Sequence, residues 1–115
     1  MRDDDPAARF LAVADRISQT APVALDATGA ALIAAVHLGV GSDSRSLANK
    51  LGIAHALVLR EINALDGRMM TTEKRDARTQ RTWVKLTDEA SALALAASDV
   101  LLKPSLEDHA HSQME

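Results

Sequence analysis

The stretch TTEKRDARTQRTWVKLTDEA, residues 71–90, gathers basic side chains in a chain whose formal net charge is −3. Five cations fall within twelve consecutive residues of it: Lys74, Arg75, Arg78, Arg81 and Lys85. Ammonium and guanidinium groups hold phosphate oxygens through charge and hydrogen bonds. The stretch therefore predicts a segment that binds a polyanion.

Charge is divided unevenly along the rest of the chain. Residues 42–86 carry nine basic and five acidic side chains, a net charge of +4, whereas the remaining residues carry four basic and eleven acidic ones, a net charge of −7. A basic middle between acidic ends favours polyanion binding by the middle and a different task for the ends.

The sequence offers little for other kinds of chemistry. It contains no cysteine, which excludes disulfides, a thiol switch and cysteine-based metal sites. It shows no Ser/His/Asp constellation, no Gly-rich phosphate loop and no close pair of carboxylates in an apolar pocket. His109 and His111 would need a further ligand to hold a metal, and we interpret them as part of a polar tail. We therefore expect no enzyme, no metal and no cofactor.

Length and composition indicate one domain of 115 residues that is 47% apolar. Ala, Leu, Val and Ile dominate its apolar residues, which favours helices, and the only aromatic residues are Phe10 and Trp83. No apolar run approaches the roughly 20 residues that span a bilayer. The N-terminal sequence MRDDDPAA is too acidic for a signal peptide, and we expect no membrane segment. The absence of cysteine indicates a reducing cytoplasm.

The basic residues need elements that position them, and the pattern predicts a mainly helical α+β domain. Pro6 suits a first helical turn, whereas Asp26 and Thr87 suit N-caps. Ser44 or Asp43 is expected to cap the first helix of the helix-turn-helix. The expected elements are helices over 6–20 and 26–38, a helix-turn-helix over 44–66, a hairpin over 68–86, a helix over 87–103 and a polar tail over 104–115.

The local pattern LANKLGIAHALVLREI is typical of a helix-turn-helix. Leu47 points inward from the first helix, Gly52 makes the sharp turn, and Ile53 fills the corner. Val58 and Ile62 then pack the second helix, as two helices that cross steeply after a short turn require. An ordinary helical hairpin is the alternative interpretation.

Burial of one face of that second helix leaves an outer face that could enter a major groove. Arg60 could bond a guanine edge, Asn63 could read adenine, and His55 could donate to a phosphate or a base. Ala56 and Leu59 could touch a thymine methyl group. His55 without any role is the alternative.

The hairpin after this helix pair is interpreted as a wing that straddles a phosphate backbone. Alternation predicts that Thr82, Val84 and Leu86 face the core, while Arg81, Trp83 and Lys85 face the other way. We expect Trp83 to fill space beside the core or a neighbouring element, with stacking on a nucleotide as the alternative. A solvated charged loop is the alternative interpretation of the hairpin tip.

Within that tip, Asp76 precedes Arg78 by two residues, and we expect its carboxylate to orient the guanidinium. Together with the helix-turn-helix, the hairpin completes a predicted set of DNA contacts: Arg45, His55, Ala56, Leu59, Arg60, Asn63, Lys74, Arg75, Asp76, Arg78 and Arg81.

The order of these motifs resembles the winged-helix core of the MarR family of bacterial transcriptional regulators. Its most specific part is DAR at 76–78, followed after a strand by LTDE at 86–89, which is similar to the Asp-x-Arg of that family's wing and the Leu-Thr opening of its next helix. The resemblance covers about residues 26–102. It implies a homodimer on a pseudo-palindromic operator, with Arg78 in the minor groove and Asp76 as its positioning partner.

The chain departs from the family at several positions. Family members often carry Ser or Thr near the start of the recognition helix, where this chain has AHAL at 54–57. Sequence readout would then rest mainly on His55, Arg60 and the wing. Glu61 stands where the family prefers an apolar residue, and the chain is short for the family, which implies trimmed terminal helices.

The acidic ends are expected to build a dimer. The last helix has apolar residues on more than one side, so one side can cover the core while another meets a partner. The predicted interface comprises Phe10, Val13, Ile17, Leu95 and Leu102. The alternative is a monomer in which the first helix packs against the last.

The function that we expect is a sequence-specific regulator, a repressor that binds double-stranded DNA as a homodimer. The alternative is a winged-helix module that binds another protein. A small-molecule effector would fit the family, but the sequence gives it no support beyond the vague candidates Arg16 and His37.

Overall fold

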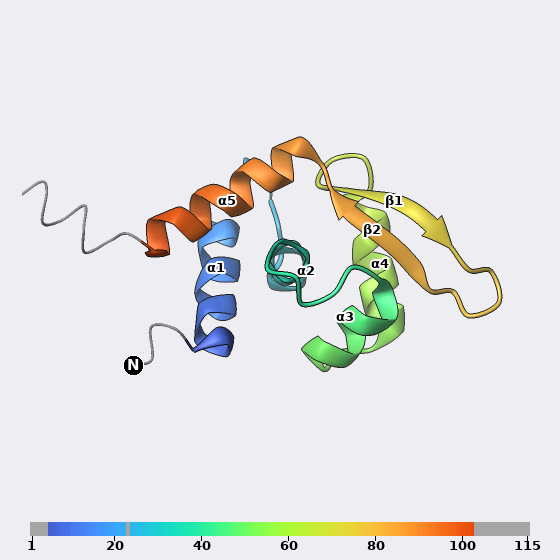
Figure 1. The fold of residues 1–115 in the computed structure, drawn as a ribbon. Coiled ribbons are helices and arrows are strands. Elements are labelled where there is room, and N and C mark those ends of the chain that lie inside the picture. Colours follow the sequence, from blue (N-terminus) through green and yellow to red (C-terminus); the bar gives the residue numbers. More distant parts are fainter. Residues whose placement is uncertain (1–4, 23, 103–115) are drawn as a thin grey trace, which may run out of the picture.

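The computed structural model describes residues 5–22 and 24–102, with side chains as far as Asp99. Within these residues the chain is a mainly helical α+β protein, as the sequence predicts, with five helices and one two-stranded antiparallel sheet (Figure 1). Its elements are α1 (Pro6–Thr20), α2 (Ala27–His37), α3 (Ser44–Leu51), α4 (His55–Leu65), β1 (Met70–Arg75), β2 (Thr82–Leu86) and α5 (Asp88–Leu102). The tail expected over 104–115 lies outside the described residues.

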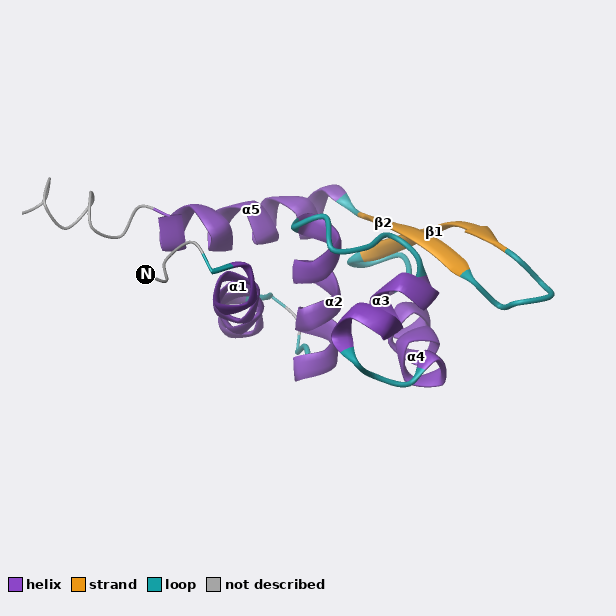
Figure 2. Cartoon of the chain, turned by 60° about the horizontal axis from the view of Figure 1, so that its bottom comes forward, coloured by secondary structure: helices purple, strands orange, loops and turns teal. Residues whose placement is uncertain are grey.

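Helix α2 forms the centre of the molecule, and the other elements pack around it. It contacts α1, α4, α5 and β2, and Figure 2 shows it between α1 and the α3–α4 pair. Its apolar sequence explains this position: the consecutive residues Leu32, Ile33, Ala34 and Ala35 point to different sides of the helix, and all four are buried. A helix that is apolar on every side is stable only inside a protein.

Side-chain caps start most of the helices. Asp26 Oδ1 accepts a hydrogen bond of 2.8 Å from the Gly29 amide, and Thr87 Oγ1 accepts one of 3.2 Å from the Ala90 amide. Asp43, rather than Ser44, caps α3, because its carboxylate accepts hydrogen bonds from two amides of the first turn. These bonds satisfy donors that a helix start otherwise leaves unpaired.

The turn between α3 and α4 depends on glycine. Gly52 has a φ of 70°, in the left-handed region that residues with a Cβ rarely adopt. Its amide donates to Ala48 O at 2.9 Å and closes helix α3. Ile53 follows and packs against the core, as the sequence predicts. The chain can therefore reverse within three residues and begin α4 at His55.

The hairpin pairs β1 with β2 from Met70↔Leu86 to Arg75↔Thr82, with a bulge between Thr72 and Lys74. Thr82 and Val84 are buried, whereas Lys85 is exposed and Trp83 is half-buried, so the predicted alternation of β2 is confirmed. A third segment borders β2, because the Val84 amide donates to Ser42 O at 2.9 Å. This contact fixes the hairpin to the start of α3.

The prediction that Val13 and Ile17 of α1 belong to a dimer interface is wrong. Val13 and Ile17 have no exposed surface, because their stripe on α1 is covered within the chain, where α1 contacts α2 and α5. Phe10 is half-buried against the same core. Leu95 does remain exposed, at 54% of its surface, and Leu11 is exposed at 64%. The side chain of Leu102 lies outside the described part.

None of the helices in the described part of the chain combines the length and the apolar character that crossing a membrane requires.

Candidate nucleic-acid interface

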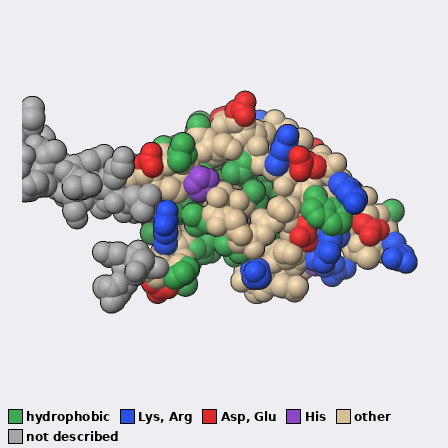
Figure 3. All heavy atoms as spheres, in the orientation of Figure 1, with side chains coloured by type: hydrophobic (Ala, Val, Ile, Leu, Met, Phe, Trp, Pro, Cys, Tyr) green, Lys and Arg blue, Asp and Glu red, His purple; other side chains and the backbone are tan. Residues whose placement is uncertain are grey.

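The predicted basic residues lie on the α3–α4 pair and on the hairpin, which are in contact with each other. Helix α3 contacts β2, and α4 contacts β1; Figure 2 shows both helices beside the hairpin. The cations on these elements have exposed side chains: Arg45, Arg60, Lys74, Arg75, Arg78 and Arg81. In the view of Figure 3 several Lys and Arg side chains gather at the hairpin end, interspersed with acidic ones.

The hairpin tip is ordered by Asp76, although not in the expected way. Its Oδ1 accepts a hydrogen bond of 2.9 Å from the backbone amide of Arg78, and its carbonyl accepts one of 2.7 Å from the Gln80 amide. The bond from the Arg78 amide holds the pKa of Asp76 below its ordinary value. The prediction that Asp76 orients the guanidinium is therefore wrong in its detail, since Asp76 shapes the turn and positions Arg78 through its backbone.

Two contacts hold the hairpin against α3. Arg81 Nε lies 3.2 Å from Asp43 Oδ2, and Arg45 Nη2 donates to Thr79 O at 3.0 Å. Burial alone would raise the pKa of Asp43, but hydrogen bonds from Ser46 and the charge of Arg81 outweigh it and keep the pKa below its usual value. The ion pair thus joins the cap of α3 to the end of the hairpin loop, directly before β2.

Trp83 is half-buried, and its ring also lies beside two cations of the hairpin. Its half-buried ring has Lys74 Nζ at 4.9 Å and Arg81 Cζ at 5.8 Å from the centroid. Both distances suit the attraction between a cation and an aromatic face. The ring therefore reduces the freedom of two basic side chains on the same face of the hairpin.

Helix α4 presents part of the face that the sequence predicts. Its inner residues Val58 and Ile62 are fully buried, as expected. Ala56, Arg60 and Asn63 are exposed, whereas Leu59 and His55 are half-buried. The outward orientation predicted for Leu59 and His55 is therefore only partial.

His55 is engaged in a bridge that the sequence did not predict. Its Nε2 lies 2.7 Å from Ser44 Oγ, and the same oxygen accepts a hydrogen bond of 2.9 Å from the Thr82 amide. Ser44 is fully buried. The sequence indicates Ser44 only as a candidate cap, because its contact with His55 depends on the crossing of α3 and α4.

A pair of carboxylates was also missed. Asp26 Oδ1 and Glu61 Oε1 both lie over Gly29, where an added Cβ would be 3.3 Å from the first and 3.5 Å from the second. Burial and the neighbouring Asp26 raise the pKa of Glu61. The pair explains the odd placement of Glu61, because its carboxylate reaches the N-terminus of α2 instead of the apolar core.

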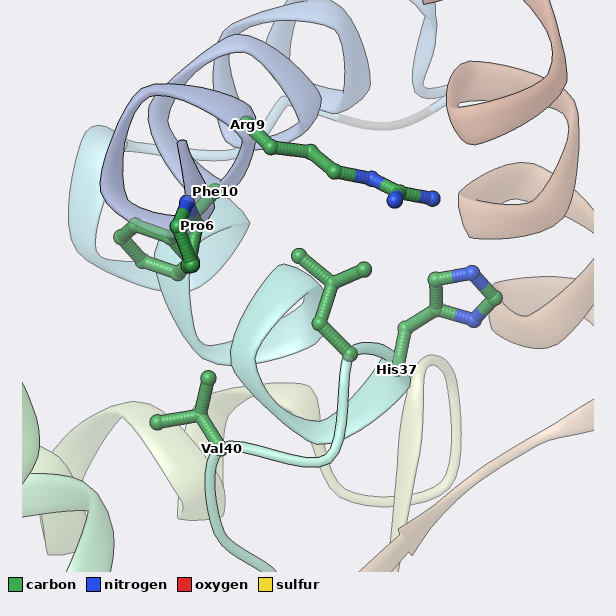
Figure 4. Close-up of a pocket in the computed structure, with 6 residues that line it drawn as sticks. Pro6, Arg9, Phe10, His37 and Val40 are labelled. Carbon is green, nitrogen blue, oxygen red and sulfur yellow. The ribbon is translucent and has the colours of Figure 1, made fainter. Parts of the chain in front are cut away.

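A groove of about 520 Å³ lies between the start of α1 and the end of α2. Figure 4 shows Arg9 and His37 on one side of it and Phe10 and Pro6 on the other; Leu38 and Val40 complete the lining. Of the two residues named as candidates for binding a small-molecule effector, His37 lines this groove and Arg16 does not. Arg9 is the arginine that lines it.

No metal-binding group of three or more His, Cys, Asp or Glu side chains occurs in the described part of the chain. His109 and His111 lie outside that part.

No protein-family model matches the chain, and no curated protein matches it either.

Proposed function

We propose that this chain is a double-stranded DNA-binding transcriptional regulator of the winged helix-turn-helix type, similar to the MarR family. Helix α4 enters a major groove, and the β1–β2 hairpin follows the adjacent phosphate backbone with Arg78 in the minor groove. The observation that carries the proposal is the attachment of a basic hairpin to the α3–α4 pair through the Asp43–Arg81 ion pair and the Arg45–Thr79 hydrogen bond.

Different residues would contact the phosphates and the bases. Arg45, Lys74 and Arg75 are exposed cations that suit phosphates, which supply affinity without sequence information. Arg60 and Asn63 are exposed on α4, where a guanidinium can bond guanine and a carboxamide can bond adenine in bidentate fashion. This division favours binding that is strong on any DNA at low salt and selective on few bases.

A second copy of the chain completes the proposed regulator. Leu11 on α1 and Leu95 on α5 are the exposed large apolar residues in the described part, and the two helices contact each other. Two exposed leucines on neighbouring helices favour a partner surface at the end of the molecule away from the hairpin (Figure 1). A symmetric dimer would read a pseudo-palindromic operator, and repression would follow from occupying it.

One observation supports a second candidate, a module that binds another protein. Ala54, the N-cap residue of α4, makes no side-chain cap bond, and Ala54 and Ala56 are exposed. This first turn offers few polar side chains to DNA and a small apolar surface to a protein. The exposed cations of the hairpin favour DNA over this candidate.

Selection of duplexes from a random pool tests the proposal and separates the two candidates. The protein would be incubated with the pool at low salt, and bound duplexes would be amplified and sequenced over several rounds. We expect an enriched motif with two inverted half-sites, spaced by about one helical turn. Failure to enrich any sequence, together with failure to retain bulk DNA at low salt, would favour the protein-binding module.

A further inference from the structure

A buried hydroxyl connects three elements of the proposed interface. Ser44 is the first residue of α3, and its Oγ contacts the Thr82 amide of β2 at 2.9 Å and Nε2 of His55, the first residue of α4, at 2.7 Å. No surface of Ser44 is exposed. Water therefore cannot replace either contact without a change in packing.

The donors and acceptors of this bridge determine the form of the imidazole. A backbone amide can only donate, so Ser44 Oγ must accept from Thr82. A hydroxyl can accept a second bond, so the tautomer is set by its one proton: His55 Nε2 is the partner within 2.7 Å that can accept it, which places the ring proton on Nδ1. If Nε2 carried a proton instead, the hydroxyl proton of Ser44 would have no acceptor among the hydrogen bonds of the described residues.

The surroundings of His55 also favour its neutral form. Burial lowers the pKa of its imidazole first, and the positive charges of Arg45 on α3 and of Arg81, directly before β2, lower it further. Asp43, the cap of α3, opposes them in part. The hydrogen-bond geometry favours a proton on Nδ1, and the nearby charges favour the neutral ring.

We propose that Ser44 is a positioning residue, which holds His55 as the neutral Nδ1–H tautomer so that Nδ1 donates a hydrogen bond to a DNA phosphate oxygen. The phosphate contact rests on the proposed DNA-binding function, whereas the tautomer does not. Helix α4 starts without a side-chain cap, so its first amides and its dipole favour an anion beside His55. The hydrogen bond from the Thr82 amide to Ser44 fixes the position of this donor relative to the hairpin.

The tautomer is tested first, by long-range proton–nitrogen NMR on the free full-length chain. We expect wild type to show a single tautomer at His55, protonated on Nδ1, with a titration midpoint below that of an ordinary imidazole. In Ser44→Ala both tautomers should appear and the midpoint should rise. An Nε2–H tautomer in wild type overturns the proposal, and this measurement decides it even if Ser44→Ala fails to fold.

The phosphate contact is tested by the pH dependence of DNA affinity. His55→Ala should weaken binding about tenfold, as expected for one hydrogen bond to a charged phosphate. His55→Gln keeps a donor and an acceptor but cannot titrate, and it should restore part of the affinity. The ratio of wild-type to His55→Gln affinity should stay constant between about pH 8 and about pH 6.

Two results overturn the contact, and they differ from failure of the proposed function. An affinity ratio that rises as the pH falls means that the imidazolium, not the neutral ring, contacts DNA. Full affinity of His55→Ala means that His55 makes no contact. A wild-type chain that binds no DNA at any salt concentration refutes the proposed function itself, and the NMR result on the tautomer still stands.

Discussion

Arg81 Nε lies 3.2 Å from Asp43 Oδ2, and this ion pair joins the end of the hairpin loop to the start of α3. Asp43 does two things at once, because the same carboxylate accepts hydrogen bonds from the Arg45 and Ser46 amides. Arg81 is also placed against the Trp83 ring. Loss of this one carboxylate should therefore disturb both the helix start and the hairpin.

Replacement of Asp43 should separate its two tasks. Asp43→Ala removes the cap and the ion pair, and we expect it to lower the free energy of unfolding by about 1–2 kcal/mol. Asp43→Asn keeps an oxygen that can cap the helix but loses the charge, so its loss should stay below about 1 kcal/mol. Urea denaturation measures both changes. Equal losses in the two variants would show that the cap contributes nothing.

The same carboxylate predicts a pH dependence of stability. The pKa of Asp43 is lowered in the folded state, so its ionised form stabilises the fold. This contribution is complete above the unfolded value of about 3.9 and is lost as the pH falls through the lower folded value. The difference in unfolding free energy between wild type and Asp43→Asn should therefore shrink from about pH 6 to about pH 2. A difference that grows in acid would contradict the assignment.

Glu61 should show the opposite sign. Its pKa is raised by burial and by Asp26, so its carboxylate opposes folding once ionised. Glu61→Gln should raise the free energy of unfolding at neutral pH by about 0.5 kcal/mol, the size of a like-charge pair near solvent. The gain should vanish below the unfolded Glu value of about pH 4.3, where wild type is protonated. Thermal or urea unfolding at several pH values measures it.

An Asp26→Asn background supplies the control for Glu61. The gain from Glu61→Gln should be smaller there, because one of the two charges is already absent. Asn can still cap α2, so the cap itself is kept. An unchanged gain would assign the effect to burial of Glu61 alone.

Replacement of the exposed leucines should abolish the proposed dimer. We expect wild type to sediment as a dimer at tens of micromolar, and Leu11→Glu or Leu95→Glu to sediment as a monomer. Both leucines are more than half exposed in the single chain, so neither variant should lose helix content by circular dichroism. A wild-type monomer at this concentration would contradict the dimer.

Short-range patterns were enough to predict the fold class and the placement of its elements. Pro6, Asp26, Gly52 and Thr87 start or end helices through effects that act over a few residues, and the structure places each at such an end. The alternation of β2 was equally local. A period-2 pattern with one buried face predicts which residues of a strand face the core.

Contacts between distant elements escaped sequence reasoning. The stripe of Val13 and Ile17 predicts that one face of α1 is buried, but not whether the same chain or a second one covers it. Likewise, Ser44 meets His55 only because α3 and α4 cross, and Glu61 meets Asp26 only because α4 packs beside the start of α2. Such pairs depend on tertiary packing.

The central claim is that α4 and the hairpin bind one DNA duplex together, and the salt dependence of binding tests it most directly. Affinity for the selected duplex would be measured by fluorescence anisotropy over a series of salt concentrations, for wild type, Arg78→Ala and Arg60→Ala. Arg9→Ala serves as the matched control, since it removes one positive charge from α1, away from the hairpin (Figure 1).

We expect the logarithm of the wild-type binding constant to fall with the logarithm of salt concentration by about 0.9 per phosphate contacted. Arg78→Ala should weaken binding and flatten this slope by about one contact, whereas Arg60→Ala should weaken binding to the selected site more than to random DNA. Arg9→Ala should leave the slope unchanged. Unchanged affinity in both Arg78→Ala and Arg60→Ala would contradict the assignment of DNA binding to these two elements.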